Sequence, residues 1–186
     1  RVLPMADEPV ATEVRTADGW LEFQEYFVHR RQEPDVLELR FAGMAEAAPT
    51  PEVLAALAGA EAIVIAPSNP LVSIGPILDV PGMREAIAGS RAQGARVAAV
   101  SPIIGGRALK GPADRMLVAL GHEASALGVA RLYADLCDVF VLDTVDADLA
   151  PAVAALGLRP VVTDTIMGDD TSRARLAGEV LDAVRR

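Results

Sequence analysis

The chain has 186 residues and a mass of 19.5 kDa, with 52% hydrophobic and 23% charged residues, a composition that excludes a disordered or low-complexity protein. Its formal net charge of −9 disfavours binding to DNA or RNA, although a nucleotide needs only a local basic patch. No apolar run approaches the ~20 residues that a membrane-spanning helix needs, so no membrane segment is expected.

The first part of the chain, residues 1–42, is predicted to be a β-rich subregion. Apolar and polar residues alternate over residues 10–14, Asp18-Gly19 is a hairpin-turn pair, and apolar residues resume at 20–23. Residues 23–32 are predicted to form a short helix. The alternation over residues 37–41 predicts a half-exposed strand that ends at Gly43.

From residue 43 onward the pattern changes to alternating strands and helices. Short continuous apolar runs, such as AIVIA, are typical of parallel strands that are covered on both faces. Strands are predicted at residues 62–66, 96–100, 139–142 and 160–163, and helices at residues 51–58, 81–93, 112–120, 125–136, 148–156 and 171–185. This order predicts one α/β domain in which a parallel sheet has helices on both faces and the 1–42 subregion is appended.

Two long polar loops follow the first two predicted parallel strands, where open parallel sheets bind ligands. The first loop, SNPLVSIGPIL at residues 68–78, carries Ser68, Asn69 and Ser73 between prolines. Asn69 has a side chain that both donates and accepts hydrogen bonds, so it suits a ligand carbonyl or ring edge. A purely structural Asx turn is an equally open interpretation.

The second loop, SPIIGGRALKGP at residues 101–112, combines features of a phosphate site. Gly105-Gly106 permits positive φ angles or a close approach of the backbone to a ligand. Lys110 is the only lysine of the chain, and Gly111-Pro112 precedes a predicted helix start, which favours an anion. The loop is neither a Walker motif nor a dinucleotide-binding motif. A surface turn with a solvated lysine remains the alternative.

Other polar groups have a functional and a structural interpretation. His122 and Glu123 are adjacent at a helix junction, where capping is favoured over catalysis because neighbouring residues on a helix do not face one another. His29 stands beside Arg30 and Arg31, a basic cluster that could meet an anionic ligand or simply face solvent.

Metal sites have little support in the residue pattern. Asp143 follows a predicted strand and is the better candidate for a metal or a ribose, whereas Asp169-Asp170 precedes a helix and is expected to cap it. With two histidines and one cysteine, a zinc site is not expected. Cys137 is interpreted as a core residue, and a lone cysteine suits a reducing cytoplasm.

Several long motifs in order resemble the 2-phospho-L-lactate transferase family, and the resemblance covers nearly all of the chain. They lie at residues 23–28, 66–78, 99–117, 121–133 and 161–167. The resemblance implies a Rossmann-like fold and transfer of a phospholactyl or phosphoenolpyruvyl group from a guanosine diphosphate-type donor. The implied acceptor is the ribityl hydroxyl of the 8-hydroxy-5-deazaflavin precursor in coenzyme F-420 biosynthesis, with release of guanosine monophosphate. Mg²⁺, a homodimer and a cytoplasmic location are also implied.

Carried over onto this sequence, the resemblance implies two ligand-binding loops for the donor and the deazaflavin. The implied substrate-binding residues are Ser68, Asn69, Ser73 and Gly75 in the first loop, and Ser101, Gly105, Gly106 and Lys110 in the second.

One departure from the family pattern concerns the length of the chain. Family members are longer, and their leading strand, glycine-rich first loop and acidic cluster have no counterpart in residues 1–186. We therefore expect this chain to be the later part of a longer one and an incomplete domain. The catalytic residues and the magnesium ligands are then expected to lie outside it, and the 186 residues alone to be inactive.

Two other classes of function stay open at this stage. One is a related regulatory protein that binds a nucleotide or a sugar nucleotide without catalysis. The other is a structural half-domain that serves a dimer interface. Within the transferase interpretation, the donor group (lactyl, enolpyruvyl or glyceryl) is undetermined, since these groups differ by a few atoms and discrimination depends on the shape of the pocket.

Overall fold

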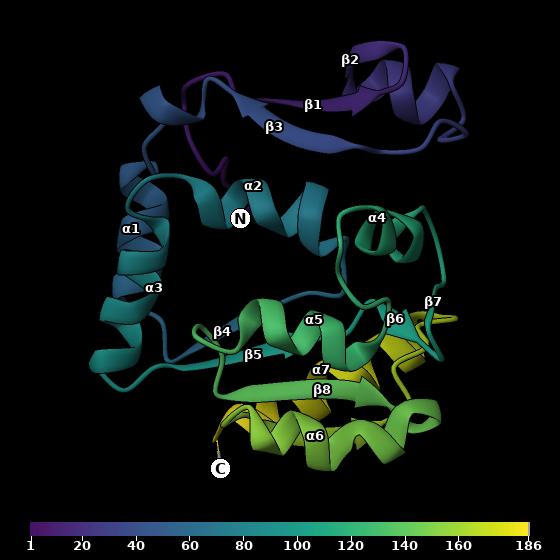
Figure 1. Ribbon diagram of the computed structural model, residues 1–186. Helices are drawn as coiled ribbons and strands as arrows, with labels where there is room; N and C mark the ends of the chain where they lie inside the picture. Colours follow the sequence, from purple (N-terminus) through teal and green to yellow (C-terminus); the bar gives the residue numbers. More distant parts are fainter. Residues whose placement is uncertain (186) are drawn as a thin grey trace.

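Four short apolar segments form a parallel sheet at the centre of the fold, in the computed structural model that describes residues 1–185 (Figure 1). The strands are β4 (Ala62–Ile65), β5 (Arg96–Val100), β8 (Val139–Asp143) and β9 (Arg159–Thr163), and they lie in the order β4-β5-β8-β9. All three neighbouring pairs are parallel, as predicted. Their carboxyl ends therefore meet at one edge of the sheet.

Strand β5 shows why these segments are mostly apolar. Its side chains alternate between the two faces of the sheet, and both faces are buried. Val97 and Ala99 belong to the larger core cluster on one face, while Ala98 and Val100 pack in a second cluster on the other. A strand covered on both faces needs apolar residues at every position.

Helices cover both faces of the sheet, which confirms the predicted α/β class. Helix α7 (Asp170–Arg185) lies against β4, β5 and β8 on one face. The opposite core cluster contains buried residues of helices from the middle of the chain. These are α3 (Met83–Ala92), α5 (Ala126–Tyr133) and α6 (Ala150–Ala155), with partly buried residues of α1 (Pro51–Ala58) packed against the cluster. Within residues 1–185, no helix is both long and apolar enough to cross a bilayer.

A separate three-stranded antiparallel sheet forms the early subregion, with the order β2-β1-β3. It contains β1 (Ala11–Thr16), β2 (Gly19–Glu22) and β3 (Glu38–Ala42), and Figure 1 shows it beside α2 and α4, away from the parallel sheet. The segment between β2 and β3 forms η1 (Glu25–His29), a short helix of π type, which confirms the predicted helix there. A 3₁₀ turn, η2 (Met44–Glu46), follows β3.

Two predicted helix starts are capped as the sequence indicates. The hydroxyl of Thr50 accepts a hydrogen bond from the amide of Val53 at 3.3 Å at the start of α1. The hydroxyl of Ser125 accepts one from the amide of Gly128 at 2.9 Å at the start of α5. Both side chains satisfy amides that the first turn of a helix leaves without a partner.

The first predicted loop is helical, which corrects the expectation for residues 68–78. Two short helices occupy it: η3 (Pro70–Ile74), of π type, and α2 (Gly75–Asp79). The prolines and Gly75 suggest breaks, but Pro70 and Pro76 both stand in first turns, where a helix does not need their missing N–H group.

Two more segments differ from the prediction. The second loop contains a hairpin of β6 (Ile103–Ile104) and β7 (Arg107–Ala108), followed by α4 (Ala113–Ala119). The predicted helix at residues 148–156 is divided into the 3₁₀ segment η4 (Thr144–Leu149) and α6.

Candidate functional site

The main cavity opens where β4 and β5 end and has a volume of about 550 Å³, within the range of small-molecule sites. Its lining comes from the exits of β4, β5 and β9, the β6–β7 hairpin and the early subregion. The lining residues are Phe23, Phe27, Pro67, Ser68, Asn69, Val72, Ser73, Ser101, Pro102, Ile104, Ala108, Leu109, Lys110, Gly111, Pro112, Ala113, Thr165, Met167 and Arg173.

The exit of β4 supplies the first group of predicted ligand residues. Ser68, Asn69 and Ser73 all line the cavity. The side-chain oxygen Oδ1 of Asn69 accepts hydrogen bonds from the amides of Leu71 at 2.9 Å and Val72 at 3.3 Å, so it caps η3. The structure therefore contains the Asx-type capping turn that the sequence left open, and the oxygen of Asn69 is already engaged.

Gly75 lies away from this cavity, unlike the other residues predicted from the first loop. It lines a second cavity, of about 400 Å³, between β3 and α2. A Cβ atom at this position would lie 3.1 Å from the carbonyl oxygen of Pro70 and 3.8 Å from the ring of Phe41. Close packing of η3 and β3 accounts for the glycine here.

The exit of β5 supplies Ser101 and Lys110 to the main cavity. Ser101 is buried, and its hydroxyl donates to the carbonyl of Ile103 at 2.8 Å and accepts from the amide of Ile103 at 3.1 Å. This reciprocal pair turns the chain into the β6–β7 hairpin. Lys110 is exposed and lies just beyond the hairpin, on the lining of the cavity.

Gly105 and Gly106 form the tip of the hairpin and are absent from the lining of the main cavity. Their φ angles of 56° and 77° lie in the left-handed region, which confirms the predicted positive φ. The amide of Gly105 donates to the carboxylate of the buried residue Asp146 at 3.0 Å. The two glycines therefore shape the hairpin that carries Ile104 and Ala108 to the cavity.

Sequence reasoning did not assign the residues that follow β9. Thr165, Met167 and Arg173 line the cavity, although they lie more than 50 residues after Lys110 in the chain. The polar exit of β9 was the available signal for Thr165. Phe23 and Phe27, on the subregion, were also not assigned; their spacing of four residues was the signal that both side chains share one face.

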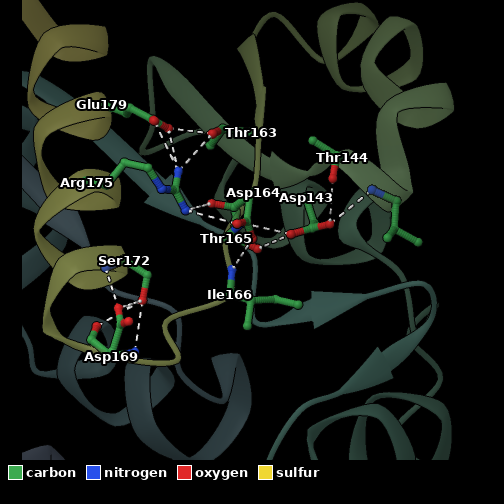
Figure 2. Close-up of polar contacts among 11 residues, drawn as sticks. Asp143, Thr144, Thr163, Asp164, Thr165, Ile166, Asp169, Ser172, Arg175 and Glu179 are labelled. Atoms are coloured by element: carbon green, nitrogen blue, oxygen red, sulfur yellow. Dashed lines mark hydrogen bonds and ion pairs between the residues drawn. The ribbon is translucent and has the colours of Figure 1, made fainter.

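Asp143 holds the β9 exit in place, as Figure 2 shows. Its carboxylate accepts four hydrogen bonds: from the amide of Val145 at 3.0 Å, the hydroxyl of Thr144 at 3.2 Å, and the amide and hydroxyl of Thr165, both at 2.8 Å. Burial alone would raise the pKa of Asp143, but these hydrogen bonds favour the charged form and the net pKa is lowered. Both of its oxygens are therefore engaged by donors of the protein.

A second polar group beside it fixes the start of α7 relative to β9 (Figure 2). Arg175 donates to the backbone carbonyl of Asp164 at 2.7 Å and pairs with Glu179 at 3.1 Å, and Thr163 donates to Glu179. Asp169 accepts from the amide of Ser172 at 2.7 Å, the capping role that the sequence predicts.

The other candidates from the sequence have structural partners outside the cavity. His29 and Arg30 both contact Glu25, at 2.6 and 3.1 Å. Glu123 accepts from the hydroxyl of Ser125 at 2.5 Å and pairs with Arg131, whereas the residue that caps α5 is Ser125.

The lining of the main cavity is cationic, although the chain as a whole is acidic. The only charged residues of its lining are Lys110 and Arg173, and no Asp or Glu belongs to it. Arg173 also pairs with Asp170, whose side chain is exposed, at 2.7 Å. A cationic, otherwise apolar and hydroxyl-bearing cavity is suited to a small ligand that carries phosphate groups.

Comparison with known proteins agrees with the sequence motifs. The profile of the family described as 2-phospho-L-lactate transferase CofD matches residues 1–178. The chain is 42% identical over 182 residues to the 2-phospho-L-lactate transferase of Methanosarcina mazei and 42% identical over 187 residues to the phosphoenolpyruvate transferase of Streptomyces griseus. Each match covers 98% of this chain and 58% of the relative, so the chain spans little more than half the length of these curated relatives.

Solved structures agree on the fold. The chain is similar to a Bacillus halodurans protein that was solved twice and is described in one case as a member of the upf0052 family. The TM-score is 0.62 in both cases, with 20% and 17% identity. The matches cover 97% and 95% of this chain and 61% of that protein. At this level of identity the likeness concerns the fold alone.

Proposed function

The chain belongs to the 2-phospho-L-lactate transferase family, and on that premise we propose that it forms the substrate pocket of a transferase in coenzyme F-420 biosynthesis. The transferred group is phospholactyl or phosphoenolpyruvyl, and the donor is its guanosine diphosphate-type conjugate. The acceptor is the terminal ribityl hydroxyl of the 8-hydroxy-5-deazaflavin precursor, and guanosine monophosphate leaves.

The cationic cavity at the carboxyl edge of the sheet is the observation that carries this proposal. Lys110 and Arg173 reach it from segments that follow different strands. In phosphoryl transfer, charge spreads over phosphate oxygens, and most of the catalysis comes from positioned groups that stabilise this charge. The two side chains are suited to hold the phosphates of the donor in an orientation that presents the reacting phosphorus to the acceptor.

Magnesium is part of the proposal, although we assign no residue to it. Mg²⁺ is usually held by one or two carboxylates together with phosphates of the substrate. Residues 1–185 contain no cluster of three or more His, Cys, Asp or Glu side chains that could hold a metal ion. The two buried acids nearest the cavity, Asp143 and Asp146, use carboxylate oxygens to hold backbone and hydroxyl groups.

The experiment measures guanosine monophosphate released by the complete gene product. The protein is mixed with Mg²⁺, the deazaflavin precursor and guanosine-activated phospholactate or phosphoenolpyruvate, and products are quantified by chromatography. We expect release that requires the acceptor and is faster with one donor. No release with any donor, together with binding of a guanosine or uridine nucleotide, would refute the transferase and favour a regulatory nucleotide-binding protein.

A matched pair of variants tests the role of the cavity charge. Lys110→Ala removes a cation from the cavity, whereas Arg107→Ala removes one from the exposed hairpin, where Arg107 pairs with Asp114 at 3.3 Å outside the cavity. Hydrogen bonds to charged groups contribute about 1.5–3 kcal/mol, so Lys110→Ala should lower kcat/KM for the donor roughly 10- to 100-fold. Arg107→Ala should leave it unchanged, because exposed ion pairs contribute little. Equal effects of the two substitutions would contradict the proposal.

The 186-residue chain itself provides a further arm of the experiment. We propose that it does not turn over by itself, since it spans 58% of the length of its relatives. Acceptor-dependent release of guanosine monophosphate by this chain alone would refute that expectation and assign the whole reaction to its residues.

A further inference from the structure

An aromatic wall closes the main cavity on the side of the early subregion. Phe23 and Phe27 both line the cavity, and their rings lie with centroids 5.4 Å apart and planes tilted by 30°. They are the only aromatic residues of its lining. Each side chain is partly exposed, so part of each ring is available to a ligand.

The local sequence explains why these rings point into the cavity. Phe23 and Phe27 are four residues apart around η1, which places them on one face of the helical turn. Tyr26 is buried with Val14 and Met116 in the core that joins the subregion to α4, and Phe23 packs against this core. Phe23 is therefore anchored on the core while part of it lines the cavity.

The wall is held in place before any ligand binds. Arg115 on α4 donates to the backbone carbonyl of Gln32, just after η1, at 3.0 Å. The same small core contains Met116 from α4, and Leu71 and Val72 from η3 pack against it. Because these contacts fix the rings relative to the cavity, little ordering is needed on binding, and stacking contributes more fully to affinity.

Two flat rings take part in the proposed reaction, the guanine of the donor and the tricyclic ring of the acceptor. Guanine is usually recognised through its ring N–H groups, which need acceptors such as carboxylates or amide oxygens. The lining of this cavity contains no carboxylate, and the oxygen of its one amide side chain, Asn69, already accepts two backbone hydrogen bonds. The wall next to it is apolar, which suits the face of a larger aromatic ring.

We propose that Phe23 and Phe27 form the stacking surface for the tricyclic ring of the deazaflavin acceptor. This inference rests on the proposed function and deepens it. Lys110 and Arg173 then remain for the phosphates of the donor. The two substrates are recognised by different parts of the chain: the antiparallel subregion selects the acceptor, and the segments at the edge of the parallel sheet hold the donor.

The experiment compares Phe27→Leu and Phe23→Leu with the control Val28→Ala in the complete gene product. Val28 is adjacent to Phe27 but 57% exposed and outside the cavity lining. Affinity for the deazaflavin precursor is measured by fluorescence anisotropy without donor, and the KM of each substrate is measured separately. Loss of one aromatic stacking partner should weaken deazaflavin binding roughly 5- to 100-fold, with the KM of the donor unchanged within about twofold. Phe27→Tyr should retain the affinity, because it keeps the ring.

The outcomes separate this inference from the proposed function. If both Leu variants release guanosine monophosphate normally and keep their deazaflavin affinity, the stacking role of Phe23 and Phe27 is refuted and the proposed transferase function is unaffected. A rise in the KM of the donor alone also refutes deazaflavin stacking and indicates that the guanine ring contacts Phe23 and Phe27. Phe-dependent deazaflavin binding without any group transfer supports the wall and refutes the transferase. Circular-dichroism melting of each variant establishes that a loss of binding is not a loss of folding.

Discussion

Asp143 offers a sharp test of how the site is held together, because its two oxygens hold donors that differ in their access to water. Both of its carboxylate oxygens accept two hydrogen bonds, one oxygen from Val145 and Thr144 and the other from Thr165. In Asp143→Asn, one oxygen becomes an NH₂ group, which only donates. An amide that turns its oxygen towards Thr165 keeps both buried donors satisfied and places its NH₂ group against the solvent-accessible amide of Val145, so Asn should be less damaging than Ala.

The magnitude follows from which donors lose access to water. Val145 is 68% exposed, and its amide can bind solvent when the carboxylate is gone. Thr165 is only 4% exposed, so its amide and hydroxyl become buried donors without an acceptor. Each such group costs about 1–3 kcal/mol. We therefore expect Asp143→Ala to lower the free energy of unfolding by about 3–5 kcal/mol, and Asp143→Asn, whose amide oxygen can still accept from Thr165, by only about 1–2 kcal/mol.

The assay is urea unfolding followed by circular dichroism, with Asp148→Asn as the control. Asp148 is an exposed acid on η4, five residues further along the chain. The control should match the unsubstituted protein. A loss below about 1 kcal/mol for Asp143→Ala, or an Asn variant that is no more stable than the Ala variant, would refute the reasoning.

The pH dependence of the same carboxylate has a definite sign. Burial raises the pKa of Asp143, but hydrogen bonds from Val145, Thr165 and Thr144 outweigh it, and the folded pKa is lowered. The stabilisation is therefore complete above the unfolded pKa of about 3.9 and is lost as the pH falls through the lower folded value. Acid unfolding of Asp143→Asn should show a smaller loss of stability over this range.

Three further predictions concern packing and reactivity. A Cβ at Gly128 would lie 2.0 Å from the carbonyl oxygen of Glu123, whereas a Cβ at Gly89 would meet nothing within 4 Å. Gly128→Ala should therefore lower the free energy of unfolding by about 1–3 kcal/mol, and the control Gly89→Ala should raise it by up to about 1 kcal/mol. Urea unfolding measures both changes. The hydroxyl of Tyr133 is buried and has no hydrogen-bond partner in the described part of the chain. Tyr133→Phe should therefore raise the free energy of unfolding by about 1 kcal/mol and Tm by about 2–4 °C. A drop in Tm would mean that the hydroxyl has a partner. Burial raises the pKa of the Cys137 thiol to about 12, so iodoacetamide at pH 8 should alkylate it in urea but not in buffer, and rapid labelling in buffer would contradict its burial.

The parallel sheet was predictable because its central strands are buried on both faces. After the exposed Arg96, residues 97–100 are all apolar and buried, and few other structures accept such a run. The helix starts at Thr50 and Ser125 were equally predictable, because their hydroxyls accept hydrogen bonds from amides in the first turn of each helix. These are short-range effects, and a single sequence contains them in full.

The helical form of residues 70–79 was not predictable from local preference. Prolines and Gly75 there suggest a loop, but packing of η3 and α2 between the subregion and α3 decides the conformation. Tertiary contacts of this kind outweigh propensity.

The candidate site was only partly predictable for a related reason. Ser68, Asn69, Ser73, Ser101 and Lys110 line one cavity, because strand exits in a parallel sheet converge. The aromatic wall depends on how the antiparallel subregion docks, which no spacing within the sequence specifies. Gly75, Gly105 and Gly106 serve packing and turn geometry, and a glycine alone does not distinguish these needs from close approach to a ligand.

The position of α7 bears on how the protein folds during synthesis. This helix follows all four parallel strands in the chain, yet it alone supplies the helical side of the apolar cluster formed with β5 and β8. While the nascent chain is still being translated, that side of the sheet has no cover, even after β9 has left the ribosome. Ala98, Val100, Val139 and Val141 are then exposed to chaperones or to neighbouring chains, so a pause in translation before residue 170 would favour aggregation.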